Sequence, residues 1–294
     1  MFITIIQQLL NGIVVGALYA LAAVGLGIVF GLFNVINFAH TQYMMIAAVI
    51  AIVATWAGAP YGLALIFGVA AAIFAGVLTE RVLIKPLFGH DNFRVDTLFL
   101  TMGLATLLEN SALLLFGSQP QYFSSSMSTG VFEYGELTMP MTGIHVLLIS
   151  AVIFLLLWIY TTYTRFGKSV VAVAQNSLAA AVVGIRVDLV KSIAFGIGCG
   201  LAGIAGVLWG TVYSVSYLTG STFLITSFLI VVMSGPGNLA TILIASLILG
   251  IVQSTSVVFF DTKWQQFAVI ITFIVAIILF PQGIGAGKFA RQNN

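Results

Sequence analysis

The chain has 294 residues, of which 61% are hydrophobic and only 6% are charged, whereas about a quarter of the residues in an ordinary soluble domain are charged. A soluble fold of this length has to cover its surface with polar groups, and this chain has too few, as its mean hydropathy of +1.16 indicates. The net charge of +2 says nothing about partners, and no nucleic-acid partner is expected. With a single cysteine, Cys199, no disulfide or metal site is expected.

Long, continuous apolar runs predict helices that cross a membrane, because the strands of a β-barrel alternate apolar and polar residues. At about 20 apolar residues per crossing, the chain has room for roughly eight spans in one all-α, polytopic domain over residues 1–294. The spans are expected near residues 8–31, 38–57, 61–83, 97–117, 143–163, 192–213, 239–258 and 265–280.

Positive charges indicate which ends of these helices face the cytoplasm. Nine of the ten Lys and Arg residues gather in three groups: Arg81, Lys85 and Arg94; Arg165, Lys168, Arg186 and Lys191; and Lys288 and Arg291. Because Lys and Arg are enriched on the cytoplasmic side, these segments are expected inside and the polar stretch 118–142 outside. Counting back from Arg81 places the N-terminus outside. The first apolar run has no Lys or Arg before it, so a retained helix is expected rather than a signal peptide.

Polar residues within or beside the spans are candidates for a substrate path. Asn34, Asn37 and His40 follow the first span, and they form either an unwound segment that lines the path or a polar turn between two helices. Glu109 and Asn110 lie some twelve residues into the fourth span. A carboxylate at such depth normally faces the bundle interior or a cavity, where Glu109 would contact substrate or bond neighbouring helices.

The cytoplasmic segment from Asn176 to Gly184 predicts a short helix, about 10 Å long. Asn176 and Ser177 are residues that begin helices, and Gly184 is one that ends them. The stretch between them, which includes Ala179 and Ala180, is apolar yet outside the bilayer, and such a surface usually marks a binding partner. We expect it to couple the chain to a separate ATPase. The alternative, a helix in the lipid interface, should carry Lys or Arg on its own polar face.

Small residues recur through the sixth span. Gly196, Gly200, Gly203, Gly206 and Gly210 are spaced by three or four residues, so they share one helical face. Such a face favours close packing of helices, and the alternative is a bare surface along the substrate path.

The apolar run from Thr222 to Met233 is too short to span a bilayer, and Gly235, Pro236 and Gly237 follow it. Gly and Pro interrupt helices, and broken backbone at membrane depth persists only where protein or water satisfies its polar groups. The pattern predicts one broken or re-entrant segment, with an ordinary surface turn as the alternative.

No motif indicates an enzyme, and no catalytic residues are expected. Gly167-Lys168-Ser169 resembles the end of a phosphate-binding loop, but Thr162 stands where that loop requires Gly, and no strand precedes it. The His-Glu-x-x-His and Gly-x-Ser-x-Gly patterns do not occur. The chain is therefore expected to bind neither ATP nor another cofactor and to draw its energy from other subunits.

Four blocks of sequence carry a resemblance over nearly the whole chain. They run from Asn11-Gly12 to Asn37-Phe38-Ala39-His40, from Glu80-Arg81 to Pro86-Leu87, from Arg165-Phe166-Gly167-Lys168 to Gly184-Ile185, and over Pro281-Gln282-Gly283-Ile284. In this order they resemble the branched-chain amino acid ABC permease family. The sequence departs from the family pattern at Thr41, which is usually Gly, and at Ser234-Gly235-Pro236-Gly237-Asn238, which replaces a more glycine-rich turn.

The resemblance implies a type II-like ABC importer permease in the inner membrane of a prokaryote. It also implies a homologous second permease, two ABC ATPase subunits that hydrolyse ATP, and an extracytoplasmic substrate-binding protein. The family's substrates imply a branched-chain or other neutral amino acid, or else urea or short amides. The residues alone leave two other classes open: a secondary transporter or channel with Glu109 as its ion or proton site, and a membrane scaffold.

Overall fold

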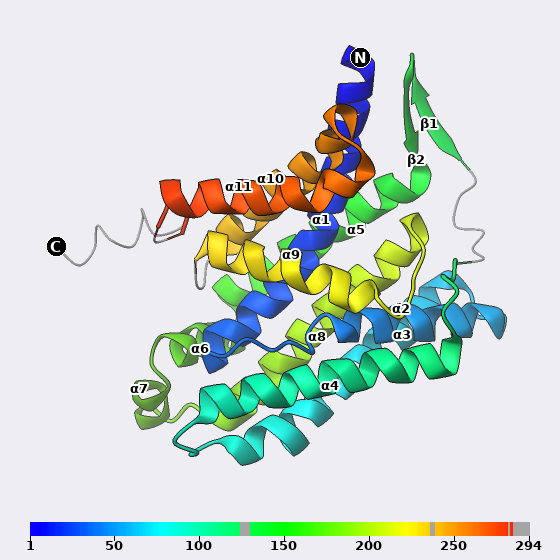
Figure 1. Cartoon of the computed structure of the whole chain (residues 1–294). Helices are drawn as coiled ribbons and strands as arrows, with labels where there is room; N and C mark the ends of the chain where they lie inside the picture. Colours follow the sequence, from blue (N-terminus) through cyan, green and yellow to red (C-terminus); the bar gives the residue numbers. More distant parts are fainter. Residues whose placement is uncertain (124–129, 236–238, 282, 285–294) are drawn as a thin grey trace.

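Helices make up most of the computed structural model, which describes residues 1–123, 130–235, 239–281, 283 and 284 (Figure 1). The α-helices are α1 (Phe2–Phe33), α2 (Gln42–Trp56), α3 (Tyr61–Thr79), α4 (Phe93–Phe116), α5 (Met141–Tyr163), α6 (Arg165–Gln175), α7 (Ser177–Val182), α8 (Val187–Val212), α9 (Thr219–Ser234), α10 (Leu239–Phe259) and α11 (Gln265–Leu279). A π-helical turn, Glu80–Ile84, and two short 3-10 turns, Lys85–Leu87 and Thr262–Trp264, extend this series.

Within the described residues, seven helices are long and apolar enough to cross a membrane, which confirms a polytopic helical protein. Each of the eight expected spans contains a helix, but the one expected over 38–57 is shorter than predicted. Its helix, α2, begins only at Gln42 and has 15 residues. The residues before it form turns instead, in which the Asn37 side chain accepts a hydrogen bond from the Ala39 N–H at 3.0 Å.

A small β-hairpin in the stretch 118–142 departs from the all-α expectation. Strands β1 (Val131–Tyr134) and β2 (Leu137–Pro140) pair antiparallel, with Glu133 opposite Thr138. The side-chain amide of Gln7 in α1 holds the hairpin as a neighbouring strand would, donating to the Thr138 carbonyl at 2.6 Å and accepting from its N–H at 3.1 Å.

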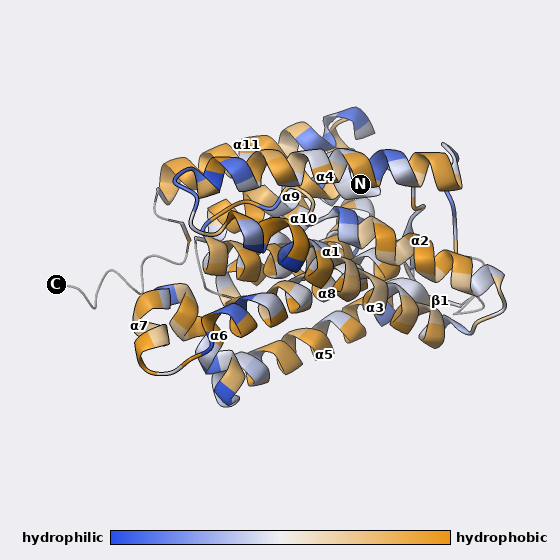
Figure 2. Cartoon of the chain, turned by 90° about the horizontal axis from the view of Figure 1, so that it is seen from below, coloured by the Kyte–Doolittle hydropathy of each residue, from blue (hydrophilic) through white to orange (hydrophobic). Residues whose placement is uncertain are grey.

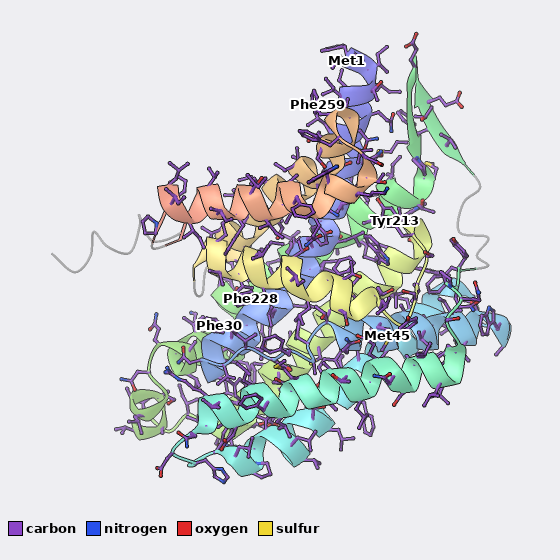
Figure 3. The ribbon with its side chains drawn as sticks, in the orientation of Figure 1. Met1, Phe30, Met45, Tyr213, Phe228 and Phe259 are labelled. Atoms are coloured by element: carbon purple, nitrogen blue, oxygen red, sulfur yellow. The ribbon has the colours of Figure 1, made fainter. Side chains whose placement is uncertain are left out.

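The two ends of the helical bundle differ in what they carry. Met1 and Phe259 lie at the same end as the hairpin, whereas α6 and α7 lie at the opposite end (Figures 1 and 3). We call these the outer end and the inner end. The arrangement agrees with the expectation that the first residues and the part of the 118–142 stretch in the hairpin lie opposite the basic segment that contains Arg165 and Lys168.

Burial divides the helices into central and peripheral ones. In the most apolar stretch of each helix, 83% of the residues are buried in α1 and 78% in α8, but only 11% in α4 and 22% in α5. Hydrophobic residues nonetheless cover most of the length of the peripheral helices, and hydrophilic ones gather mainly at helix ends and in the connections (Figure 2). An apolar surface around a buried centre is what lipid surroundings require.

Glycines let the central helices approach closely. A Cβ added at Gly206 of α8 would collide with the Met44 carbonyl of α2, and one added at Gly203 would lie 2.8 Å from the Ala72 side chain of α3. On the first helix, a Cβ at Gly12 would lie 2.6 Å from the backbone of Ile251 in α10. The stripe of small residues in α8 therefore packs against other helices, as the more favoured interpretation predicted.

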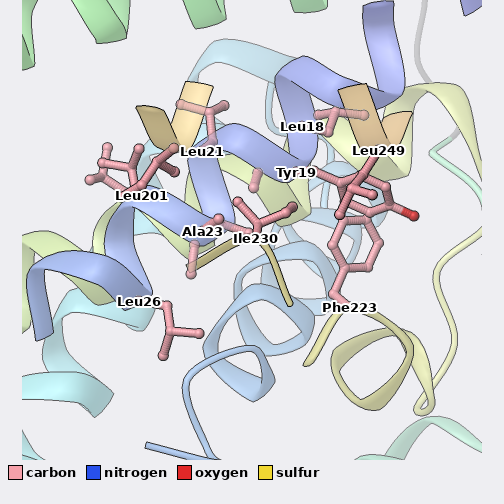
Figure 4. Close-up of a cluster of buried hydrophobic side chains, with 14 of the residues drawn as sticks. Leu18, Tyr19, Leu21, Ala23, Leu26, Leu201, Phe223, Ile230 and Leu249 are labelled. Atoms are coloured by element: carbon pink, nitrogen blue, oxygen red, sulfur yellow. The ribbon is translucent and has the colours of Figure 1, made fainter. Parts of the chain in front are cut away.

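Aromatic and aliphatic side chains fill the space where α1, α8, α9 and α10 meet (Figure 4). The rings of Tyr19 and Phe223 pack edge to face at 5.1 Å between centroids, and Trp209 packs on Phe223 at 4.7 Å. Tyr19 also donates a 2.6 Å hydrogen bond to Gln253 of α10. These contacts fix the start of α9 against α1 and α8.

Gly206→Ala is expected to destabilise the protein, because its methyl group would displace the α2 backbone. We expect the free energy of unfolding to fall by about 1–3 kcal/mol, measured by thermal or denaturant unfolding in detergent. Gly31→Ala is the matched control, since no atom lies within 4 Å of a Cβ there, and it should leave stability unchanged or slightly raised. Equal stability of the two variants would contradict the packing argument.

Candidate functional site

The segment between α1 and α2 is a non-helical chain buried inside the bundle. Asn34 ends α1 in the left-handed conformation at φ 51° and is exposed, whereas only 2% of Asn37 and 0% of His40 is exposed. The Phe38 N–H donates to the Thr101 hydroxyl of α4 at 3.2 Å. The segment is thus an unwound stretch packed in protein, and of its three candidate residues Asn37 and His40 face the interior.

Glu109 makes its contacts across three helices. Its Oε2 atom accepts a hydrogen bond from the Ser221 hydroxyl of α9 and a 3.4 Å bond from the Gln42 amide of α2. Gln42 also donates to the Ser221 hydroxyl at 3.1 Å. We call Gln42, Glu109 and Ser221 the polar triad. Sequence analysis selected only Glu109, because Gln42 and Ser221 stand at helix starts, where polar residues are common.

Asn110 does not join this cluster. Its side chain is exposed and donates to the Thr106 carbonyl of its own helix at 2.8 Å. The next residue along a helix points about 100° away, so Glu109 and Asn110 cannot face the same neighbour. The expectation that Asn110 lies on the path beside Glu109 is therefore not met by its position.

A narrow crevice opens next to the triad toward the outer end. It lies between α2, α4 and the turn before α9, and it is lined mainly by Val49, Ile52, Trp56, Ala112, Phe116 and Val215. Val49 lies two helical turns beyond Gln42, and Ala112 and Phe116 lie one and two turns beyond Glu109, so each pair shares a face. The crevice thus begins about one helical turn beyond Glu109, and none of the three triad residues lines it.

Two capped helices, α6 and α7, lie at the inner end, and α7 is the short helix predicted between Asn176 and Gly184. The Thr164 side chain caps α6 by accepting from Gly167 N–H, and the Asn176 side chain caps α7 by accepting from Ala179 N–H. Gly184 ends the second helix at φ 87°. Asn176 and Gly184 therefore begin and end a short helix as predicted.

One residue of this segment faces the opposite way from the prediction. Ala180 is only 3% exposed and packs against its own chain, so the expectation that it contacts a partner is wrong. The outward face of the segment consists of Leu178, Val182 and Val183, which are 80%, 87% and 76% exposed. Ala179 is also exposed, and Ser177 is half-buried. An apolar face of this kind, at the end of a bundle, is typical of a protein contact.

The short helix α9 ends beside the chain at Gly283 and Ile284. Gly235 follows Ser234 at φ 76°, and the Ile284 N–H donates to the Met233 carbonyl at 3.0 Å. Gly283 lies so close to Gly235 that an added Cβ would be 2.8 Å from its nitrogen. The carbonyls at the end of α9 are therefore satisfied by protein. Pro236 and Gly237, also expected in this turn, lie outside the described residues.

A buried carboxylate at the inner end was not selected as functional from the sequence. Glu80, which is 0% exposed, accepts a 2.5 Å hydrogen bond from the Ser192 hydroxyl of α8. Nearby, Lys85 and Asp188 form an exposed 3.0 Å ion pair, and the Lys191 ammonium lies 4.8 Å from the ring centre of Phe88. These contacts join the end of α3 to the start of α8, directly after α7.

The family model for "Branched-chain amino acid transport system / permease component" matches residues 8–279. The chain belongs to this family. As the four sequence blocks predicted, it is a multi-pass ABC-type transport permease and not an enzyme. Among the described residues, no group of His, Cys, Asp or Glu side chains is placed to hold a metal ion.

Known relatives match the permease over almost its full length. It is 28% identical to the high-affinity branched-chain amino acid transport permease protein LivH of Escherichia coli (strain K12), over 96% of each chain. It is 29% identical to BraD of Pseudomonas aeruginosa, over 95% of each chain. A chain of the solved PsaBC complex from Streptococcus pneumoniae, bound to a Fab, shares its fold at a TM-score of 0.51 and 13% identity, over 96% of the permease and 94% of that chain.

The contact between Glu80 and Ser192 can be measured by a double-mutant cycle. Because each residue is buried and loses a partner in either single variant, Glu80→Ala and Ser192→Ala should show a coupling of about 1–3 kcal/mol in unfolding free energy. Arg81→Ala, an exposed neighbour, should combine additively with Ser192→Ala. A purely additive Glu80 and Ser192 pair would show that the bond contributes nothing to stability.

Proposed function

We propose that the permease is the membrane subunit of a prokaryotic ABC importer that carries a branched-chain or similar neutral amino acid across the cytoplasmic membrane. The family match over residues 8–279 is the observation that carries this proposal. The relatives' names assign them branched-chain amino acids.

The importer would contain a homologous second permease, two ABC ATPases and an extracytoplasmic substrate-binding protein. The exposed apolar face of Leu178, Val182 and Val183 supports an ATPase contact at the inner end. This face carries no charge of its own. The basic residues Arg165 and Lys168 instead belong to α6, so α6 has the character of an interfacial helix and α7 that of a docking helix. A secondary transporter would need no such docking face.

Uptake by the reconstituted complex tests the substrate. Proteoliposomes that hold the permease, its partner subunits and internal ATP should accumulate labelled leucine, isoleucine or valine when the loaded binding protein is added outside. Uptake should stop when ATP is replaced by a non-hydrolysable analogue. Accumulation of urea or a short amide, with no uptake of these amino acids, would show that the permease carries the family's other class of substrates. ATP-independent uptake would contradict an ABC importer.

A charge on the docking face should separate the permease from its ATPase. Leu178→Glu places a carboxylate in a desolvated contact, where an unpaired charge costs several kcal/mol, so the ATPase should no longer co-purify and uptake should be lost. Val131→Glu is the matched control, since Val131 is also apolar and 53% exposed but lies on the hairpin at the outer end. It should leave ATPase binding intact.

Cross-linking distinguishes the ATPase from lipid as the neighbour of α7. A Ser177→Cys variant should form a cross-link to the ATPase subunit within the assembled complex. Labelling of this cysteine by lipid probes alone, with no cross-link to the ATPase, would show that α7 lies in the membrane interface.

A further inference from the structure

We propose that the polar triad is a subsite for a primary ammonium group, the one carried by an amino acid on its way through the permease. This inference rests on the proposed function and adds to it the atoms that would recognise the substrate. It also predicts which of the family's substrate classes the permease accepts, because urea and amides carry no ammonium group.

The hydrogen bonds inside the triad engage its N–H and O–H donors, but some of its acceptor oxygens remain without a partner within the triad. The Ser221 hydroxyl and the Gln42 amide both donate to Oε2 of Glu109. The Oε1 atom of Glu109 has no hydrogen bond in the described part of the chain, and Glu109 itself is partly exposed. A ligand that completes this cluster must therefore bring donors, and an ammonium group brings three of them and no acceptor.

Gln42 supplies a second free acceptor in a buried position. The residue is 1% exposed, and its Oε1 atom has no hydrogen-bond partner among the described residues. An unpaired buried acceptor costs about 1–3 kcal/mol, so a ligand that donates to it recovers that loss. Gly220 lies directly against this oxygen, and a Cβ there would collide with it. This oxygen therefore faces the backbone at the start of α9, and a ligand donor reaches it only when the amide turns toward Glu109.

The crevice marks the side from which a substrate would approach the subsite. Its apolar lining lies outward of the triad along the same faces of α2 and α4, from Val49 to Trp56 and from Ala112 to Phe116. Ser216 and Tyr217, shortly before Ser221, close it on the third side. In this structure the crevice has room for little more than a water-sized group, so an amino acid that brings its ammonium to Glu109 from the outer end requires α2 and α4 to separate there.

The proposed role differs from that of a tie between helices. A tie needs Oε2 and the two donors, and glutamine at position 109 would preserve much of it through its carbonyl oxygen. Ammonium binding needs the negative charge, because a charge-assisted hydrogen bond is about twice as strong as a neutral one. A test of the proposal must therefore compare side chains at position 109 that have similar size but different charge.

Chemical restoration of the charge provides this test. In the complete importer, Glu109→Cys should lower the uptake of leucine at least tenfold, since the loss of a hydrogen bond to a charged group is worth about that much. Reaction of the new thiol with 2-carboxyethyl methanethiosulfonate should restore most of the uptake, and reaction with the 2-aminoethyl reagent should not. Saturating leucine should slow the labelling. The native Cys199 is buried, and the treated wild type controls for it.

Two further variants separate this role from a structural one. Glu109→Gln should assemble with its ATPase and keep the ATP hydrolysis that the loaded binding protein stimulates, yet lose leucine uptake. Thr106→Cys, exposed one turn earlier on α4, should transport normally before and after either reagent.

Three results would overturn the inference. Wild-type uptake by Glu109→Gln would show that the charge is not needed, and equal rescue by both reagents would show that only size matters. Loss of assembly together with uptake in both Glu109 variants would show a structural tie. A wild-type complex that moves no amino acid at all would instead overturn the proposed function, and the subsite with it.

Discussion

Close contact between helix backbones is the constraint on which the rest of the structure depends. Inside a bilayer the lipid is as apolar as the side chains, so helices gain little from hiding apolar surface and must associate through tight packing and hydrogen bonds. In this permease, α1 and α8 cross where Gly25 and Gly198 meet, each backbone lying against the other. Gly250 of α10 approaches Gly16 of α1 in the same way. These crossings set the positions of all the helices around them.

The buried stretch before α2 shows what this rigid centre permits. Non-helical backbone survives at membrane depth only if protein satisfies its polar groups. Here, the Asn37 side chain bonds the Ala39 N–H, and Thr101 bonds that of Phe38. His40 fits because Gly25 leaves space beside its ring, where a Cβ would lie 3.0 Å from Nε2. Because α2 starts inside the bundle, its first residue, Gln42, lies beside the start of α9 and within reach of α4.

Features that depend on residues close together in the sequence could be predicted, whereas features that depend on distant residues could not. Helix positions depend on local hydrophobicity, and the caps at Asn176 and Gly184 depend on neighbouring residues, so both were predicted. The side of α7 that Ala180 occupies depends on what α6 and α8 bury, which a six-residue apolar run does not reveal. The triad joins residues 67 and 112 positions apart. A single sequence carries no signal for such pairings, although the depth of Glu109 did predict that it faces other helices.

The inner and outer features of the permease are connected by one helix. α8 begins five residues after α7 ends, and Ser192 near its start is bonded to the buried Glu80 of the α3 extension. Its other end leads into the turn before α9, where the Trp209 indole donates to the Ser214 carbonyl at 3.2 Å. Bonds and glycine contacts along its length leave α8 little freedom to bend. α8 is thus one continuous helix from Ser192 near the inner end to the turn before α9, the helix that carries Ser221.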